Sequence, residues 1–163
     1  MVVCFLCETE LTIFNVTSIQ RDGDLVCKSC VDAWTKTWTK NKTETKRTFY
    51  ENGSPASETD YVNGQRHGKA KGWYSNGQLA YETDYVNGQR HGKSQHWHTN
   101  GQLAHEDDYV NGQPHGKDKG WYESGHLWCE TDYVNGQRHG KARGWSSDGE
   151  LIYENNYVNG VKQ

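Results

Sequence analysis

Aromatic and polar residues alternate in short runs through most of the chain after residue 50. In one such run, Tyr81 and Tyr85 fall on one side of an extended strand, whereas Glu82 and Asp84 fall on the other. Ten dipeptides that end in Gly separate the runs, with spacings that alternate between 11 and 13 residues. Most are Asn-Gly, which favours type I′ hairpins because both central residues need a positive φ. The pattern predicts an elongated antiparallel β-meander over 50–163, built from a 24-residue unit.

The turns also predict which side chains face each other. If Asn87-Gly88 is a two-residue turn, Glu82 faces Lys93 and Asp84 faces His91. Such a recurring Asp–His pair, with no Ser or Cys at a fixed offset, is typical of a structural pair, and we expect no catalytic residues. The same relation predicts the further pairs Glu58–Lys69, Asp60–His67, Glu106–Lys117, Asp108–His115, Glu130–Lys141 and Asp132–His139.

Glycines fall opposite tyrosines across the other kind of hairpin. Around Asn76-Gly77, Gly72 is expected opposite Tyr81 and Gly68 opposite Tyr85. Rings that cover glycine backbone bury apolar area without aliphatic bulk. Such packing suits a chain that is 33% hydrophobic and has a mean hydropathy of -1.06.

A tryptophan recurs every 24 residues on the side of the sheet that carries the charged residues. This row is either a structural ladder or a partner-binding stripe, because Trp is enriched in interaction hot spots. His96 and His98 replace Gly72 and Tyr74 of the preceding unit, so the middle of the array is the least regular part. The candidate partner-binding residues are therefore Trp73, Trp97, Trp121, Trp145, His96 and His98.

A separate module is expected over 1–38. Cys4 and Cys7 form one CxxC pair, and Cys27 and Cys30 form a second, which is the spacing of a closed four-thiolate site for one structural zinc ion. Strand composition over 11–19, turn residues over 21–24 and a helix starting at 31 resemble a treble-clef zinc module. Two disulfides are the alternative, which a reducing compartment disfavours. The fifth cysteine, Cys129, occupies a repeat position and is expected to be a packing residue.

Charge separates the remaining function classes. Residues 39–49 are expected to form a linker, and 36–47 hold five basic residues against one acidic residue, which keeps nucleic-acid contact open as an alternative. Residues 50–163 carry eleven Lys and Arg against fifteen Asp and Glu, a net charge of -4 that disfavours anionic membranes. The chain shows neither a membrane-spanning apolar run nor a secretory signal, so we expect a cytoplasmic protein.

The segment from Tyr61 to Tyr74 resembles a MORN repeat, with its Tyr-x-x-Gly lead and later glycine and aromatic positions. The segment from Ser75 to Tyr85 is closer to bacterial MORN-variant proteins labelled as YwqK-type antitoxins. The resemblance covers 50–163 and implies hairpin arrays that act as scaffolds or protein-binding modules. The antitoxin label implies a protein that neutralises a partner protein.

The sequence therefore favours a non-enzymatic repeat protein that holds a protein partner, such as a toxin or effector, on its sheet surface. An antitoxin-like or phage-encoded inhibitor is one form of this hypothesis. The alternatives are a nucleic-acid-binding adaptor that uses the zinc module and linker, and a membrane-associated MORN scaffold. Two exposed sheet edges also leave a homo-oligomer open.

Overall fold

The computed structural model describes residues 16–21, 24–27 and 42–163. The chain divides into two units, Met1–Lys42 and Thr43–Gln163. In the first unit, β1 (Val16–Arg21) pairs with β2 (Asp24–Cys27) as an antiparallel hairpin, near the strand and at the turn that the sequence predicts. Of the four proposed zinc ligands, Cys27 ends β2, whereas Cys4, Cys7 and Cys30 lie outside the described residues, as does the helix predicted from residue 31.

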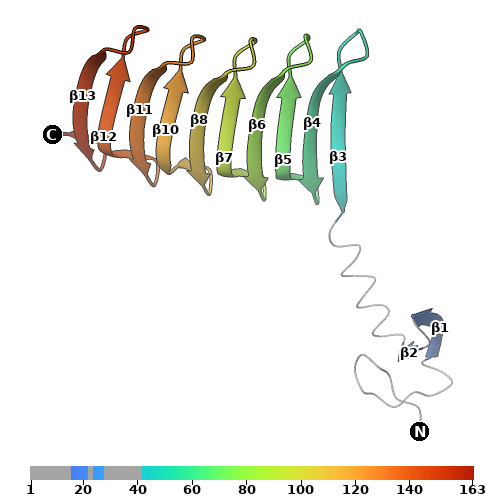
Figure 1. The fold of residues 1–163 in the computed structure, drawn as a ribbon. Helices are drawn as coiled ribbons and strands as arrows, with labels where there is room; N and C mark the ends of the chain where they lie inside the picture. Colours follow the sequence, from blue (N-terminus) through green and yellow to red (C-terminus); the bar gives the residue numbers. More distant parts are fainter. Residues whose placement is uncertain (1–15, 22–23, 28–41) are drawn as a thin grey trace. The chain divides into compact units, whose positions relative to one another are not determined.

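The second unit is one antiparallel sheet of twelve strands in chain order, in which the short β9 and β10 both pair with β8 (Figure 1). This arrangement confirms the predicted meander. No other element of Thr43–Gln163 covers either face of the sheet. The strands are β3 (Thr43–Phe49), β4 (Pro55–Val62), β5 (Gln65–Trp73), β6 (Leu79–Val86), β7 (Gln89–Trp97), β8 (Leu103–Val110), β9 (Gln113–Pro114), β10 (Gly116–Trp121), β11 (Leu127–Val134), β12 (Gln137–Trp145), β13 (Leu151–Val158) and β14 (Val161–Lys162).

The sheet begins earlier than the sequence pattern predicts. The linker expected over 39–49 is wrong for residues 43–49, which form β3 and pair with β4 along its length. Here Arg47 forms an ion pair with Glu58 at 2.6 Å and Thr45 donates to Asp60 at 2.7 Å. Of the basic residues that suggested a linker, Arg47 is thus a cross-strand partner of an acidic residue on β4, whereas Lys46 pairs with Glu44 on its own strand at 3.3 Å.

Two kinds of turn alternate along the chain. Asn63, Asn87, Asn111, Asn135 and Asn159 have positive φ, as do the glycines that follow them, which confirms the predicted type I′ geometry at these five turns. The prediction is wrong for the other five. In the turn after Tyr74, the Gly77 N–H donates to the Tyr74 carbonyl at 2.9 Å, and only Gly77 has a positive φ, as in a three-residue hairpin loop. The longer loop accounts for the alternating spacing.

The predicted Glu–Lys cross-strand pairs are wrong at the type I′ hairpins. Tyr85 faces Arg90 as expected, but Thr83 then faces Ser94 and Glu82 faces Gln95, because the register shifts between them. Gly92 adopts φ 91° in this bulge, and the Asp84 carboxylate lies over it. Of the predicted Asp–His pairs, Asp108 lies opposite His115, whose N–H donates to the Asp108 carbonyl at 2.8 Å. The predicted Glu–Lys partners of the Asn87-Gly88 hairpin, Glu82 and Lys93, do not face each other. Instead Lys93 pairs with Glu106 of the next hairpin at 3.0 Å.

The predicted glycine and tyrosine pairs are confirmed. Gly72 faces Tyr81 and Gly68 faces Tyr85. A Cβ at Gly72 would lie 2.2 Å from the Tyr81 ring, so only glycine fits beneath this ring. We call the side with Tyr81, Thr83 and Tyr85 the tyrosine face and the opposite side, with Glu82, the charged face. The small residues of the tyrosine face form the most buried row, which includes Ala70, Thr83, Ser94, Thr131 and Ala142.

Hydrogen bonds tie each repeat to the next at both ends of the strands. At the long loops, the Tyr50, Tyr74 and Tyr122 hydroxyls donate to the carbonyls of Trp73, Trp97 and Trp145, at 2.5, 2.6 and 2.9 Å. At the tight turns, the Gly88 N–H donates to the Arg66 carbonyl at 2.8 Å, and later repeats do the same. The repeats are therefore held together through backbone groups that a two-stranded hairpin alone would leave unpaired.

We predict that Tyr74→Phe destabilises the array by about 0.5 to 1.5 kcal/mol, because the half-buried Trp97 carbonyl loses its donor. The measurement is urea unfolding followed by circular dichroism. Tyr153→Phe is the matched control, because the Tyr153 ring covers Gly144 but its hydroxyl makes no hydrogen bond within the described residues. Equal unfolding midpoints for both variants and the natural protein would contradict the stabilising role of the Tyr74 hydroxyl.

Candidate functional site

The central repeats depart from their neighbours at one set of positions on the tyrosine face. His96 stands where the other units have Gly72, Gly120 and Gly144, and Asp118 stands where they have Ala70, Ser94 and Ala142. His105 and Cys129 replace the tyrosines at the positions of Tyr81 and Tyr153, and Asp107 replaces the threonines at those of Thr83 and Thr131. These replacements lie on adjacent strands β7, β8, β10 and β11, so they gather in one patch.

His105 bridges two carboxylates in this patch. The register of β8 and β10 places Gly120 opposite His105 and Lys119 opposite Glu106, which brings Asp118 opposite Asp107. The His105 Nε2 atom lies 2.7 Å from Asp118 Oδ1, and its Nδ1 atom lies 3.2 Å from Asp107 Oδ2. Asp107 is buried. Without the imidazole, two carboxylates would face each other at a partly desolvated position, which is costly.

The two carboxylates keep His105 protonated. Hydrogen bonds to Asp107 and then Asp118 raise the pKa of His105 to about 10. His105, Asp107 and Asp118 each offer one ligand atom within 4.8 Å, so they form a set that could hold a divalent metal ion. A metal ion would have to displace a ring proton of His105, because each ring nitrogen already faces a different carboxylate. The arrangement therefore favours an ion-paired triad at neutral pH.

The residues around the triad adjust to it. His96 faces His105 across the hairpin, and its ring lies 6.0 Å from that of Tyr81. Burial and the neighbouring His105 lower the pKa of His96. Burial raises the pKa of the Cys129 thiol to about 11, which leaves the thiol protonated. Trp128 covers Gly120 in place of a tyrosine at position 129, so the patch keeps its glycine covered.

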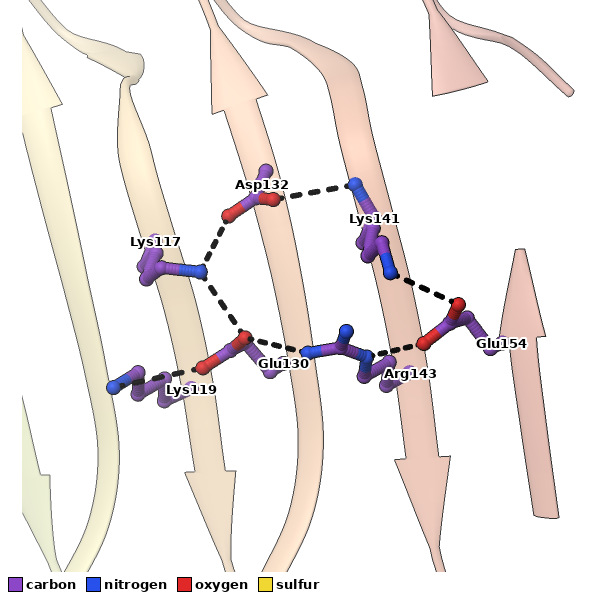
Figure 2. Close-up of polar contacts among 7 residues, drawn as sticks. All are labelled: Lys117, Lys119, Glu130, Asp132, Lys141, Arg143 and Glu154. Carbon is purple, nitrogen blue, oxygen red and sulfur yellow. Dashed lines mark hydrogen bonds and ion pairs between the residues drawn. The ribbon is translucent and has the colours of Figure 1, made fainter. Parts of the chain in front are cut away.

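The charged face is regular and its charges are compensated (Figure 2). Glu130 contacts Lys117 at 3.1 Å, Lys119 at 3.6 Å and Arg143 at 3.7 Å. Arg143 also pairs with Glu154 at 2.6 Å, and hydrogen bonds to Asp132 and then Glu130 raise the pKa of Lys117. Exposed pairs of this kind contribute little stability each, so the lattice mainly fixes the register.

Comparison with known protein families shows which family the chain belongs to. Five segments match the MORN repeat variant family, at residues 45–63, 66–87, 90–111, 114–135 and 138–159, which is more than half of the chain. The protein belongs to the MORN repeat variant family. Residues 108–117 also match the MORN repeat. The comparison with curated proteins found no match.

The partner-binding residues predicted from the sequence lie in three different kinds of position in the MORN array. Trp73, Trp97, Trp121 and Trp145 each end a strand and are half-buried. His98 takes the place of the loop tyrosines, because its Nε2 atom lies 2.8 Å from the Trp121 carbonyl oxygen. His96 is exposed on the tyrosine face, beside the triad. Only His96 among the six predicted residues therefore joins the patch.

Sequence reasoning missed His105, Asp107 and Asp118. A signal was present, because each of them differs from the residue 24 positions away in both directions. Their meeting depends on the register of β8 and β10 beyond the bulge at Gly116, which places Asp107 opposite Asp118 instead of opposite Gly116. The structure of the described residues contains no helix with the length and apolar character needed to span a membrane.

We predict that the stability of the array falls as the pH rises above about 6.5. The pKa of His105 is about 10 in the folded protein and about 6.5 unfolded, so its contribution is complete below pH 6.5 and is lost toward pH 10. A third of the side chain remains exposed, so screening limits the effect to on the order of 1 to 2 kcal/mol. Urea unfolding near pH 6.5 and near pH 9 measures it.

The variant His105→Gln removes the ionisable imidazole without placing a large ring over His96, and it should remove most of this pH dependence. The control His91→Gln alters a histidine that forms no ion pair within the described residues, and its unfolding should keep the pH dependence of the natural protein. An equal pH dependence in His105→Gln and the natural protein would contradict the role of the triad.

Proposed function

We propose that this MORN array is a non-enzymatic protein-binding module that holds its partner on the tyrosine face. The observation that supports this most directly is the patch at His96, His105, Asp107 and Asp118. Each residue breaks a pattern that the flanking units keep, and all lie on one face in the middle of the array. Residues that served only the fold would not need to differ at these four positions, because the flanking units form the same strands with other residues there.

Repeats of this family generally mediate interactions with proteins or membranes. A protein partner suits this chain better, because residues 50–163 carry eleven Lys and Arg against fifteen Asp and Glu and should be repelled by anionic lipid surfaces. Inhibition of a toxin or effector, as an antitoxin-like or phage-encoded protein would perform it, is the finer form of the proposal. It is consistent with a rigid surface that needs no reaction centre.

The chemistry of the patch supports a binding role over catalysis. Both ring nitrogens of His105 face carboxylates, so the imidazole has no nitrogen left to activate a nucleophile. The Cys129 thiol is buried and its pKa is raised to about 11, which disfavours the reactive thiolate. Ser94 is fully buried, with its hydroxyl 3.0 Å from that of Thr83.

A variant that restores the repeat pattern tests the proposal. His96→Gly, His105→Tyr, Asp107→Thr and Asp118→Ala together install the residues found at matched positions of the other units. The variant should fold, since the tyrosine introduced on β8 would cover the glycine introduced on β7, as Tyr81 covers Gly72. We expect at least about tenfold weaker binding of the protein partner recovered from the native host with the full chain, measured by titration with the purified partner.

The matched control changes the charged face. Lys93→Gln with Glu106→Gln removes an ion pair at 3.0 Å and leaves the tyrosine face intact, so it should bind within about twofold of the natural protein. Trp97→Phe with Trp121→Phe tests the tryptophan stripe. Loss of binding in the Trp variant together with full binding by the restored-pattern variant would move the site to the charged face.

We also propose that the first unit binds one structural zinc ion through Cys4, Cys7, Cys27 and Cys30. The support is their paired spacing and the β1–β2 hairpin, whose last residue is Cys27. Native mass spectrometry should find one zinc ion in the full chain and none after Cys4→Ser with Cys30→Ser, whereas Cys129→Ser should retain it. A protein isolated with two disulfides in this unit would contradict the site.

A further inference from the structure

A pocket of about 260 Å³ opens on the tyrosine face between Arg66 and Arg90. Its base includes Ala70 and Thr83, which are the small, buried residues of the central row. Tyr81 and Tyr85 stand beside it as walls, and the exposed His96 also lines it. The lining holds two guanidinium groups, hydroxyl groups and an imidazole, and it contains no carboxylate.

The two arginines have no ion-pair partner among the described residues, which distinguishes them from almost every other cation of the sheet. From residue 46 to residue 143, every other Lys and Arg except Arg138 pairs with a carboxylate. A sheet that compensates its other cations so consistently leaves two positive charges available at the pocket. Such charges are suited to an external anion.

Tyrosines hold both guanidinium groups in place. Arg66 lies 5.3 Å from the centre of the Tyr85 ring and donates to its hydroxyl at 3.2 Å. Arg90 lies 5.2 Å from the centre of the Tyr109 ring and donates to its hydroxyl at 3.1 Å. Each contact uses only some of the N–H donors of the guanidinium group and fixes its position. The loss of side-chain entropy when an anion binds to the remaining donors is therefore small.

We propose that the pocket between Arg66 and Arg90 receives an acidic side chain, Asp or Glu, from the protein partner of the tyrosine face. This inference rests on the proposed function and names the chemistry of the partner. The unpaired guanidinium groups provide the charge, and the neighbouring tyrosines and the exposed His96 add hydrogen-bonding groups to the same lining. The partner segment therefore carries a carboxylate where it crosses β5 to β7.

Charge complementarity favours a protein segment over a polyphosphate or a bilayer. The carboxylates of Asp107 and Asp118 lie on the same face beyond Ser94, so a dense polyanion that covered the pocket would also approach these acids. A peptide can place one carboxylate in the pocket and a polar or basic residue over the acids. Pro114 at the next matched position breaks the arginine row after Arg90, which limits the unpaired positive segment to this pocket.

The test uses a fluorescent decapeptide of alternating glutamate and serine, titrated with the full chain at low ionic strength and followed by anisotropy. The matched peptide with glutamine should bind at least about tenfold more weakly. Arg66→Gln with Arg90→Gln should weaken the acidic peptide by at least about tenfold, since charge-assisted hydrogen bonds are the strong ones. Arg138→Gln is the matched control, because Arg138 lies 5.5 Å from the centre of the Tyr157 ring but does not line the pocket.

Thermal unfolding of each variant establishes that it is folded, and Arg66→Lys with Arg90→Lys gives a second variant that keeps the charge. Partial binding by the lysine variant and full binding by Arg138→Gln support the pocket. Equal loss in Arg138→Gln, or no preference for glutamate over glutamine, would overturn it. A single-stranded oligonucleotide or phosphatidylserine vesicles that bind more tightly, with the same dependence on Arg66 and Arg90, would overturn the assignment to a protein.

The two proposals fail in different ways. If the peptide does not bind but the restored-pattern variant loses the protein partner, the pocket inference fails and the binding face stands. If the restored-pattern variant keeps the partner at full affinity, the proposed binding patch fails whatever the peptide does.

Discussion

The array depends on one constraint, which is that a single-layer sheet has no second layer to bury its side chains. Each side chain must therefore be covered by its own neighbours within the face. Tyr81 over Gly72 and Tyr153 over Gly144 meet this need, because the missing Cβ lets a ring lie flat on the strand. The loop tyrosines meet a second need, since the hydroxyl of Tyr74 supplies a donor to the Trp97 carbonyl of the next hairpin. Apolar burial and backbone satisfaction thus come from the same residue type.

The same constraint makes the two faces different. The charged face needs no burial, so Lys69 and Lys71 can share Glu82, and a lattice of exposed ion pairs is sufficient to set the register. The tyrosine face has to be covered, so a substitution there changes what lies beside it. When His105 replaces a tyrosine, Asp107 and Asp118 appear around it, and when Cys129 replaces another, Trp128 covers the glycine instead. Substitutions on the tyrosine face therefore occur together at neighbouring positions.

The sequence was sufficient for the order of the strands and for the hairpins whose turns need positive φ at Asn. It was insufficient where a positive φ at a glycine within a strand shifted the register of the cross-strand pairs. Gly92 has the sequence pattern of a small strand residue, and only the structure shows that it lies in a bulge. Strand β3 was missed because it follows no Asn-Gly turn, although its Arg47 finds Glu58. The triad required knowledge of the same kind of bulge at Gly116, which places Asp107 opposite Asp118 instead of opposite Gly116. The candidate binding role of His96 could be predicted, because it departs from a glycine that its neighbours keep.

A repeat protein provides its own reference for deciding which residues serve more than the fold. The flanking units show that Gly, Tyr, Thr and Ala satisfy the tyrosine face at matched positions, so these residue types are sufficient for the sheet. His105 with two carboxylates performs the same covering role with three ionisable groups, at the cost of desolvating them. A cost that stability does not require is most simply explained by an external contact that benefits from fixed charge. The unpaired Arg66 and Arg90 lie on the same face, on β5 and β7, so one partner segment running across β5 to β10 would meet both charge groups.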